Sequence, residues 1–180
     1  MKRLSDRERV AYHEAGHAVM RYELRLPFKR VSIVPDGETL TVGRVQHQYP
    51  PTFRPDCNTD LRTEGRIKHE VMAALAGELA ETYATGHRDW WALAMDSQNA
   101  FAFAAYVTAS GDEAAAYIRW LWERTKLYLA RPWVWPRSRR WWPRCCNMMS
   151  CPGLGPAALS RRDCVPGGML RGQVATSREF

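Results

Sequence analysis

The chain has 180 residues with 46% hydrophobic and 25% charged side chains, a composition typical of one folded domain and not of a disordered chain. Its formal net charge of +7 would suit a polyanionic partner, but that charge is unevenly distributed. Residues 137–180 contain eight arginines and two acids, whereas residues 1–136 carry 18 basic and 17 acidic side chains. The first 136 residues are therefore nearly neutral, and their charge does not favour nucleic acid as a partner.

Two features of the sequence do not favour a membrane-spanning or exported protein. The longest nearly apolar run, residues 100–109, is much shorter than the roughly 20 residues that a bilayer-spanning helix needs. The N-terminal sequence MKRLSDRERV lacks the apolar stretch of a secretory signal. We therefore expect a cytoplasmic protein with no membrane span. A reducing compartment does not favour disulfides among the five cysteines.

The first predicted element is a helix that begins at Asp6 and ends between Tyr22 and Leu24. Ser5 and Glu8 stand three residues apart at its start. This spacing is the signature of a capping box, in which each side chain accepts a hydrogen bond from the other residue's backbone amide. The helix should therefore begin sharply.

A small sheet and three more helices are predicted after this helix. Two runs rich in β-branched residues, 30–34 and 40–45, flank a Pro-Asp-Gly turn at 35–37 and predict an antiparallel hairpin. Residues 48–58 form a proline-rich loop. Apolar spacing and end signals then predict helices over residues 60–85, 96–109 and 112–130. The expected fold class is α+β, predominantly helical, with a small β-hairpin or sheet and a helical C-terminal half.

The pattern ends after Pro136, so we expect a domain over residues 1–136 and an unpatterned tail over residues 137–180 without regular structure. Four cysteines lie in this tail, but it contains no CxxC pair and no histidine, which does not favour a zinc cluster. Its arginines and tryptophans could contact nucleic acid through charge and stacking. A flexible tail without a defined function is the favoured interpretation.

A second hypothesis for the tail is a frameshift near Pro136. Residues 137–149 (RSRRWWPRCCNMM) can be back-translated so that a one-base shift reads AVEALVAALLQHD, which has the pattern of an amphipathic helix. A shift would account for the arginines, tryptophans and cysteines together. The nucleotide sequence decides it, because codons that give no helical pattern in the other frame would exclude the hypothesis.

The strongest chemical signal is the HExxH motif His13-Glu14-Ala15-Gly16-His17 inside the first predicted helix. Histidines at i and i+4 project from one helix face, where both can bind one zinc ion while Glu14 acts on a zinc-bound water. Catalytic zinc also needs a third protein ligand. The HExxHxxGxxH continuation is absent, and spacing alone leaves several candidates open, namely Glu70, Glu78, Glu81, Asp96, His47, His69 and His87.

Four segments resemble the peptidase domain of FtsH-type, AAA-associated zinc proteases. Residues 11–19 (AYHEAGHAV) resemble that family's active-site helix, which typically reads AYHEAGHA, and residues 30–35 (RVSIVP) resemble its KVTIIPRG strand. Residues 75–81 (LAGELAE) are similar to its LAGRAAEE helix, and residues 96–100 (DSQNA) fall where the family has ND-x-x-x-A. The resemblance extends over about residues 8 to 110.

The resemblance implies a site and a chemistry for this chain. It implies that His13, His17 and Asp96 bind Zn²⁺ and that Glu14 is the general base. It gives Glu81 a supporting role beside the metal ligands. The family's ATPase module and membrane anchor have no counterpart in this sequence, so we expect peptides or unfolded protein segments as substrates, or an ATPase partner acting in trans.

The predicted function is a zinc-dependent metallopeptidase that hydrolyses peptide bonds. The alternative is a catalytically inactive domain of the same fold that serves as a binding or regulatory module. We interpret the apolar and aromatic side chains on the predicted helix over 112–130 as residues that pack inside the protein. Self-association through these side chains is the lesser alternative.

Overall fold

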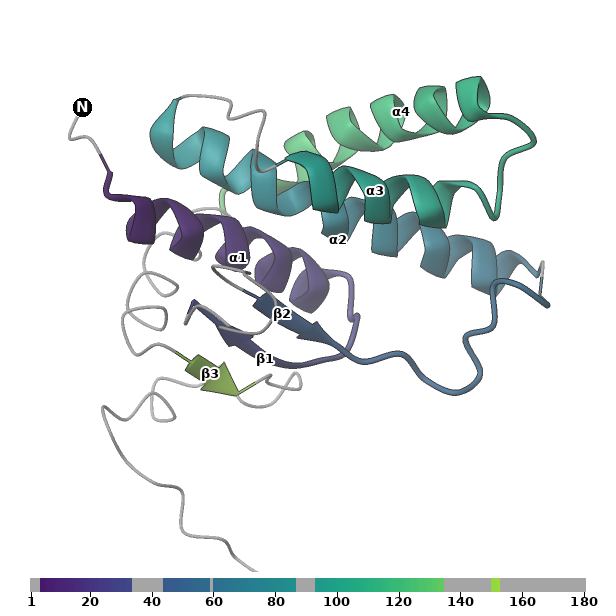
Figure 1. The fold of residues 1–180 in the computed structure, drawn as a ribbon, viewed down its shortest axis with the longest axis horizontal. Helices are drawn as coiled ribbons and strands as arrows, with labels where there is room; N and C mark the ends of the chain where they lie inside the picture. The colour runs from purple at the N-terminus through teal and green to yellow at the C-terminus, as the bar shows by residue number, and fades with distance from the viewer. Residues whose placement is uncertain (1–3, 34–43, 59, 87–92, 135–149, 153–180) are drawn as a thin grey trace, which may run out of the picture.

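The computed structural model describes residues 4–33, 44–58, 60–86, 93–134 and 150–152. In these residues the elements follow the order α1-β1-β2-α2-α3-α4-β3. Helix α1 lies between the small sheet on one side and the helices α2, α3 and α4 on the other (Figure 1). The predicted class, α+β and predominantly helical, is confirmed.

Helix α1 spans Asp6–Glu23 and begins with the predicted capping box. The Glu8 backbone N–H donates to the Ser5 hydroxyl at 3.3 Å, and the Ser5 backbone N–H donates to the Glu8 carboxylate at 2.8 Å. The helix ends where Arg25 adopts a left-handed conformation with φ 56°. Both ends agree with the sequence prediction.

The sheet has three antiparallel strands in the order β2-β1-β3. The predicted pairing of the first two strands is confirmed, with β1 at Phe28–Ser32 and β2 at Arg44–His47, while the turn at 35–37 lies outside the described residues. Strand β3, Ser150–Pro152, comes from the segment for which the sequence predicts no regular structure. The domain boundary at residue 136 stays a prediction.

The sheet packs on α1 through a small apolar cluster. Val31 of β1 is paired with Val45 of β2, and both are buried together with Ala18 of α1. This contact holds β2 beside the middle of α1, which is the part of the helix that carries the HExxH motif.

Helix α2 spans Leu61–Thr85 and agrees closely with the prediction. The Asp60 side chain accepts a hydrogen bond from the Thr63 backbone N–H at 2.7 Å, and Gly86 ends the helix with φ 73°, a conformation that glycine adopts without steric cost. Helix α3 was predicted over residues 96–109 but spans Leu93–Ala104. After Ala104 the backbone forms tighter i to i+3 hydrogen bonds, so the apolar run to residue 109 does not continue the helix.

Helix α4 spans Gly111–Leu129, with Ser110 as its cap. Leu121 and Leu129 are completely buried against the core, whereas Trp120 is half exposed. Among the described residues, no helix combines the length and the apolar composition that crossing a bilayer requires.

The tightest contact in the core is that between α1 and α2. A Cβ atom placed on Gly16 of α1 would lie 2.3 Å from the carbonyl oxygen of Ala76 and 2.5 Å from the Cβ of Ala80, both on α2. Real Cβ atoms essentially never approach so closely. Glycine within the HExxH motif therefore lets the two helices approach each other closely.

A buried ion pair joins the C-terminal half of α1 to α2. Arg21 Nη1 lies 2.6 Å from Glu70 Oε2, and both side chains are 1% exposed. Arg21 Nη2 also donates to the Pro27 carbonyl oxygen at 3.0 Å, and Arg66 Nη2 lies 3.2 Å from Glu70 Oε1. This network fixes α1, α2 and the start of β1 relative to one another.

We predict that Arg21→Met lowers the free energy of unfolding by about 3–5 kcal/mol, because the variant leaves the Glu70 charge buried without its main partner. The double variant Arg21→Met/Glu70→Leu should be more stable than the single one. Lys126→Met is the control, since its 3.6 Å pair with Glu123 is exposed and should contribute less than about 0.5 kcal/mol. Urea unfolding of the full chain measures the free energy of unfolding of all three variants. Equal losses of that free energy in Arg21→Met and Lys126→Met would contradict the prediction.

Candidate metal centre

Helix α1 places the two histidines of the HExxH motif on the face that contacts α2. The Nε2 atoms of His13 and His17 are 3.1 Å apart, and the rings meet edge to face with centroids separated by 4.8 Å. Both imidazoles are largely buried, with side chains 14% and 10% exposed. Two nitrogen lone pairs can therefore be directed at one point between the helices.

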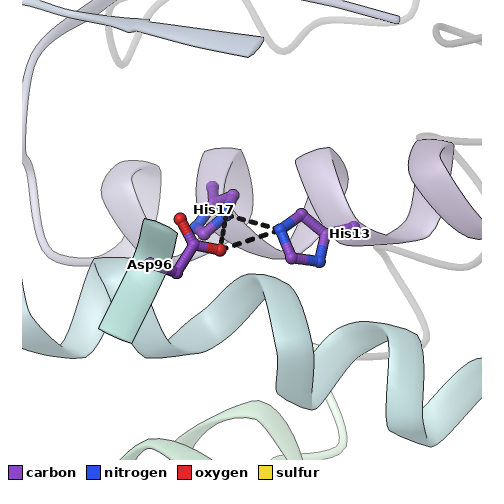
Figure 2. Close-up of side chains that lie close together, drawn as sticks. All are labelled: His13, His17 and Asp96. Atoms are coloured by element: carbon purple, nitrogen blue, oxygen red, sulfur yellow. Dashed lines mark hydrogen bonds and ion pairs between the residues drawn. The ribbon is translucent and has the colours of Figure 1, made fainter. Parts of the chain in front are cut away.

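Asp96, in the first turn of α3, completes this group. Its Oδ2 atom lies 2.8 Å from His13 Nε2 and 3.0 Å from His17 Nε2. Dashed lines in Figure 2 mark both contacts. Ala100 and Ala104 of α3 are completely buried, and their small side chains allow α3 to pack closely on its neighbours. That packing brings an aspartate 79 positions beyond His17 to the histidines.

The other ligand candidates from the sequence lie elsewhere. Among the described residues, the group of His, Cys, Asp and Glu side chains that could share one ion consists of His13, His17 and Asp96. Glu70 is paired with Arg21, His47 contacts the Tyr49 hydroxyl, and His69 lines a surface pocket near the C-terminal end of α1.

Glu78, Glu81 and His87 are the remaining three candidates. Glu78 is buried but does not join the group. Glu81 lies at the Nδ1 side of His13, away from the shared Nε2 atoms. His87 lies outside the described residues.

The outward nitrogen of each histidine faces an acceptor on α2. His17 Nδ1 lies 2.8 Å from the carbonyl oxygen of Ala73. Since a carbonyl can only accept, Nδ1 carries a proton, which leaves Nε2 as the ring nitrogen that can bind a metal ion. His13 Nδ1 lies 3.4 Å from Glu81 Oε2, an arrangement typical of metal-binding histidines. Glu81 therefore lies beside the His13 ring, and its supporting role stays a prediction.

Helix α2 forms the floor beneath the two imidazoles at Gly77. A Cβ atom on Gly77 would lie 2.3 Å from His17 Nε2 and 2.8 Å from His13 Nε2. Any larger residue would push the rings out of their present positions. The glycine of the LAG segment therefore has a steric role in this site.

Glu14 is the fourth residue of the site and is 7% exposed. Burial raises the pKa of its carboxyl group, and the negative charge of Asp96 raises this pKa further. The positive charges of His17 and His13 lower it, but the net shift of the pKa is upward. The Val45 backbone amide of β2 donates a hydrogen bond to this carboxylate. The sheet therefore helps to position the side chain that the motif nominates as a base.

The electrostatics of the group favour a positive charge between its members. Burial would lower the pKa of His13, but its interactions with Asp96 and Glu81 raise that pKa to about 10. Burial would raise the pKa of Asp96, but His17 and His13 hold it well below its usual value. A cation between these side chains would be stabilised by the same acidic groups.

The donor set and its spacing fit a zinc ion. Two imidazole nitrogens and one carboxylate oxygen form the ligand set of many catalytic zinc sites, which keep a fourth position open. Ligand atoms bound about 2.0–2.1 Å from a tetrahedral zinc ion are roughly 3.3 Å apart. The separations here, 2.8, 3.0 and 3.1 Å, require only a small widening.

Comparison with known families supports the same chemistry. The family model "Peptidase family M41" matches residues 2–93, about half of the chain. The chain belongs to peptidase family M41. The M41 match contains His13, Glu14 and His17 and ends just before Asp96. M41 is a family of zinc metallopeptidases.

Curated M41 relatives share this region of the chain. An ATP-dependent zinc metalloprotease FtsH from Syntrophus aciditrophicus is 35% identical over 87 residues, which are 47% of this chain and 11% of that protein. FtsH 1 from Sorangium cellulosum is 41% identical over 83 residues (45% and 12%). The mitochondrial inner membrane m-AAA protease component YTA10 from Saccharomyces cerevisiae is 35% identical over 78 residues (42% and 9%). The chain thus matches about a tenth of the length of these relatives.

Sequence reasoning missed three participants in this M41 site. The Ala73 carbonyl and the close approach at Gly77 depend on how α1 and α2 pack, and neither leaves a signal in residue type alone. Arg9, which contacts Glu81, precedes His13 by four positions on the same helix. That i to i+4 spacing was the one signal that could have identified it.

We predict that Gly77→Ala weakens zinc binding about ten- to hundredfold, because the new methyl group overlaps both imidazoles and overpacking of this kind costs about 1–3 kcal/mol. Gly65→Ala on the same helix is the matched control, since a Cβ there meets no atom within 4 Å. Competition with a chromophoric chelator measures both affinities. Equal affinities for the two variants would show that α2 does not constrain the imidazoles.

Proposed function

We propose that this chain is a zinc-dependent endopeptidase domain that hydrolyses peptide bonds. The observation that carries the proposal is the convergence of His13, His17 and Asp96 on one point beside the buried Glu14. Membership of M41 supports the same activity. In this proposal the three converging side chains bind zinc and Glu14 is the general base.

Each group of the site has a distinct task in the proposed reaction. Zinc, when bound by His13, His17 and Asp96, supplies a Lewis acid that activates water and polarises the scissile carbonyl. Glu14 accepts the proton of the attacking water and then delivers it to the nitrogen of the leaving amine. The raised pKa of Glu14 suits this transfer, because it brings the carboxyl group closer to the working pH.

The supporting contacts hold these groups in place. The Ala73 carbonyl accepts from His17 Nδ1 and orients that ring, and Glu81 Oε2 lies beside His13 Nδ1. An oriented imidazole keeps its Nε2 directed at the metal. The hydrogen bond from Val45 in β2 restrains Glu14. These restraints lower the cost of organising the site when a substrate binds.

The proposed substrates are peptides and unfolded protein segments. The matched FtsH relatives are named ATP-dependent proteases, so the proposal includes an ATPase partner acting in trans. It also includes a peptidase domain that covers residues 1–136. The cytoplasmic location expected from the sequence stays a prediction.

We predict that Glu14→Gln lowers kcat/KM for peptide cleavage by about 10² to 10⁴ while zinc stoichiometry stays unchanged, because the amide keeps the shape of the side chain but cannot accept the proton. Glu123→Gln, an exposed position on α4, is the control and should cleave like the wild type. Cleavage of a fluorogenic peptide, with metal analysis of each sample, provides both measurements.

The outcomes of this experiment separate the proposal from its alternative. Equal cleavage by the wild type and Glu14→Gln would remove Glu14 from its role as base. Zinc bound by a wild type that cleaves neither the peptide nor unfolded casein would favour the inactive binding module.

A further inference from the structure

We propose that Arg9 is a positioning residue of the metal site, which acts on the ligand His13 through Glu81. The proposal rests on the zinc site of the proposed function. It goes beyond that function because it assigns a role to a side chain outside the HExxH motif and outside the ligand set.

The contact between Arg9 and Glu81 is specific in its geometry. Arg9 Nε and Nη2 donate to the same oxygen, Glu81 Oε1, at 2.9 and 2.7 Å. The other oxygen, Oε2, lies 3.4 Å from His13 Nδ1. One carboxylate thus contacts the guanidinium with one oxygen and the imidazole with the other.

The second of these contacts depends on the first. A separation of 3.4 Å is longer than the 2.7–3.2 Å of most N–H···O hydrogen bonds, so the Glu81–His13 contact restrains the carboxylate weakly. The Glu81 side chain is 8% exposed and has three rotatable bonds. Two charge-assisted hydrogen bonds from Arg9 therefore supply most of the force that holds Oε2 beside the ring.

Helix geometry explains why Arg9 can reach this position. Arg9 precedes His13 by one turn of α1, and Glu81 follows Gly77 by one turn of α2, so both lie on the faces that form the site. Arg9 is one-third exposed, unlike Arg21 in the other arginine–glutamate pair between these helices. Arg21 is completely buried and its carboxylate partner does not contact the ligand group. Arg9 can therefore be replaced at smaller cost to the fold.

A fixed Glu81 matters for the metal in two ways. A carboxylate beside Nδ1 favours a proton on that nitrogen, which leaves Nε2 of His13 to bind zinc. Arg9 also holds Glu81 on the Nδ1 side of the ring, so that this carboxylate does not become a competing ligand. Removal of an outer partner of this kind typically lowers metal affinity about 10- to 100-fold.

The test measures the zinc dissociation constant of the full chain by chelator competition. The variants are Arg9→Met, Arg9→Lys, Glu81→Gln and the double variant Arg9→Met/Glu81→Gln. We expect Arg9→Met to bind zinc about tenfold more weakly and Arg9→Lys, which keeps the charge, to recover part of that loss. The double variant should bind within about twofold of Glu81→Gln alone, because Arg9 acts through Glu81.

Arg7→Met, at an exposed position two residues away, is the matched control and should bind zinc like the wild type. The thermal midpoint of each zinc-free variant shows whether the fold is kept. Wild-type affinity in Arg9→Met would overturn the proposal. A full tenfold further loss when Arg9→Met is added to Glu81→Gln would also overturn it, because Arg9 would then act on the fold directly.

The zinc measurement requires no turnover, so the two proposals can fail separately. A wild type that binds zinc without cleaving peptides contradicts the peptidase function. The zinc dissociation constants of the wild type and the Arg9 variants still decide the role of Arg9 in that case. A wild type that cleaves peptides, together with an Arg9→Met variant of unchanged zinc affinity, contradicts the role of Arg9 alone.

Discussion

The close contact between α1 and α2 is the constraint on which the metal centre depends. Each helix contributes one glycine to it, and a Cβ atom at either position would overlap its neighbours: Gly16 lies against Ala76 and Ala80, and Gly77 lies against the imidazoles of His13 and His17. The backbone of α2 therefore forms the floor of the site. Ala73 on the same helix face supplies the carbonyl that orients His17.

Two ion pairs fix how these helices are aligned along their axes. Arg9 pairs with Glu81 and Arg21 pairs with Glu70, so the helices run antiparallel, with one pair on either side of the histidines. A slip of one residue would shift α1 by about 1.5 Å and rotate it by roughly 100°. Such a slip would separate the buried Arg21–Glu70 pair, and unpaired buried charges are strongly disfavoured. The same alignment keeps both Nε2 atoms beside Asp96.

The sequence predicted the local features well because each depends on neighbouring residues. The capping box at Ser5 and the pairing of β1 with β2 follow from short-range rules. Asp96 is different, since spacing could not choose it among several acids and histidines, and only the family resemblance selected it. Arg9 was missed because a lone arginine on a helix resembles a solvated side chain until the opposite helix is known. The early end of α3 at Ala104 was missed because the apolar run continues past it.

X-ray absorption spectroscopy of the zinc-loaded full chain tests the central claim most directly. The account predicts one zinc per chain with a first shell of nitrogen and oxygen atoms at about 2.0–2.1 Å, including the scattering pattern of two imidazoles from His13 and His17. Five cysteines are present in the chain, and zinc–sulfur bonds are distinctly longer, at about 2.3 Å. A sulfur shell, or a shell without imidazole, would contradict the account.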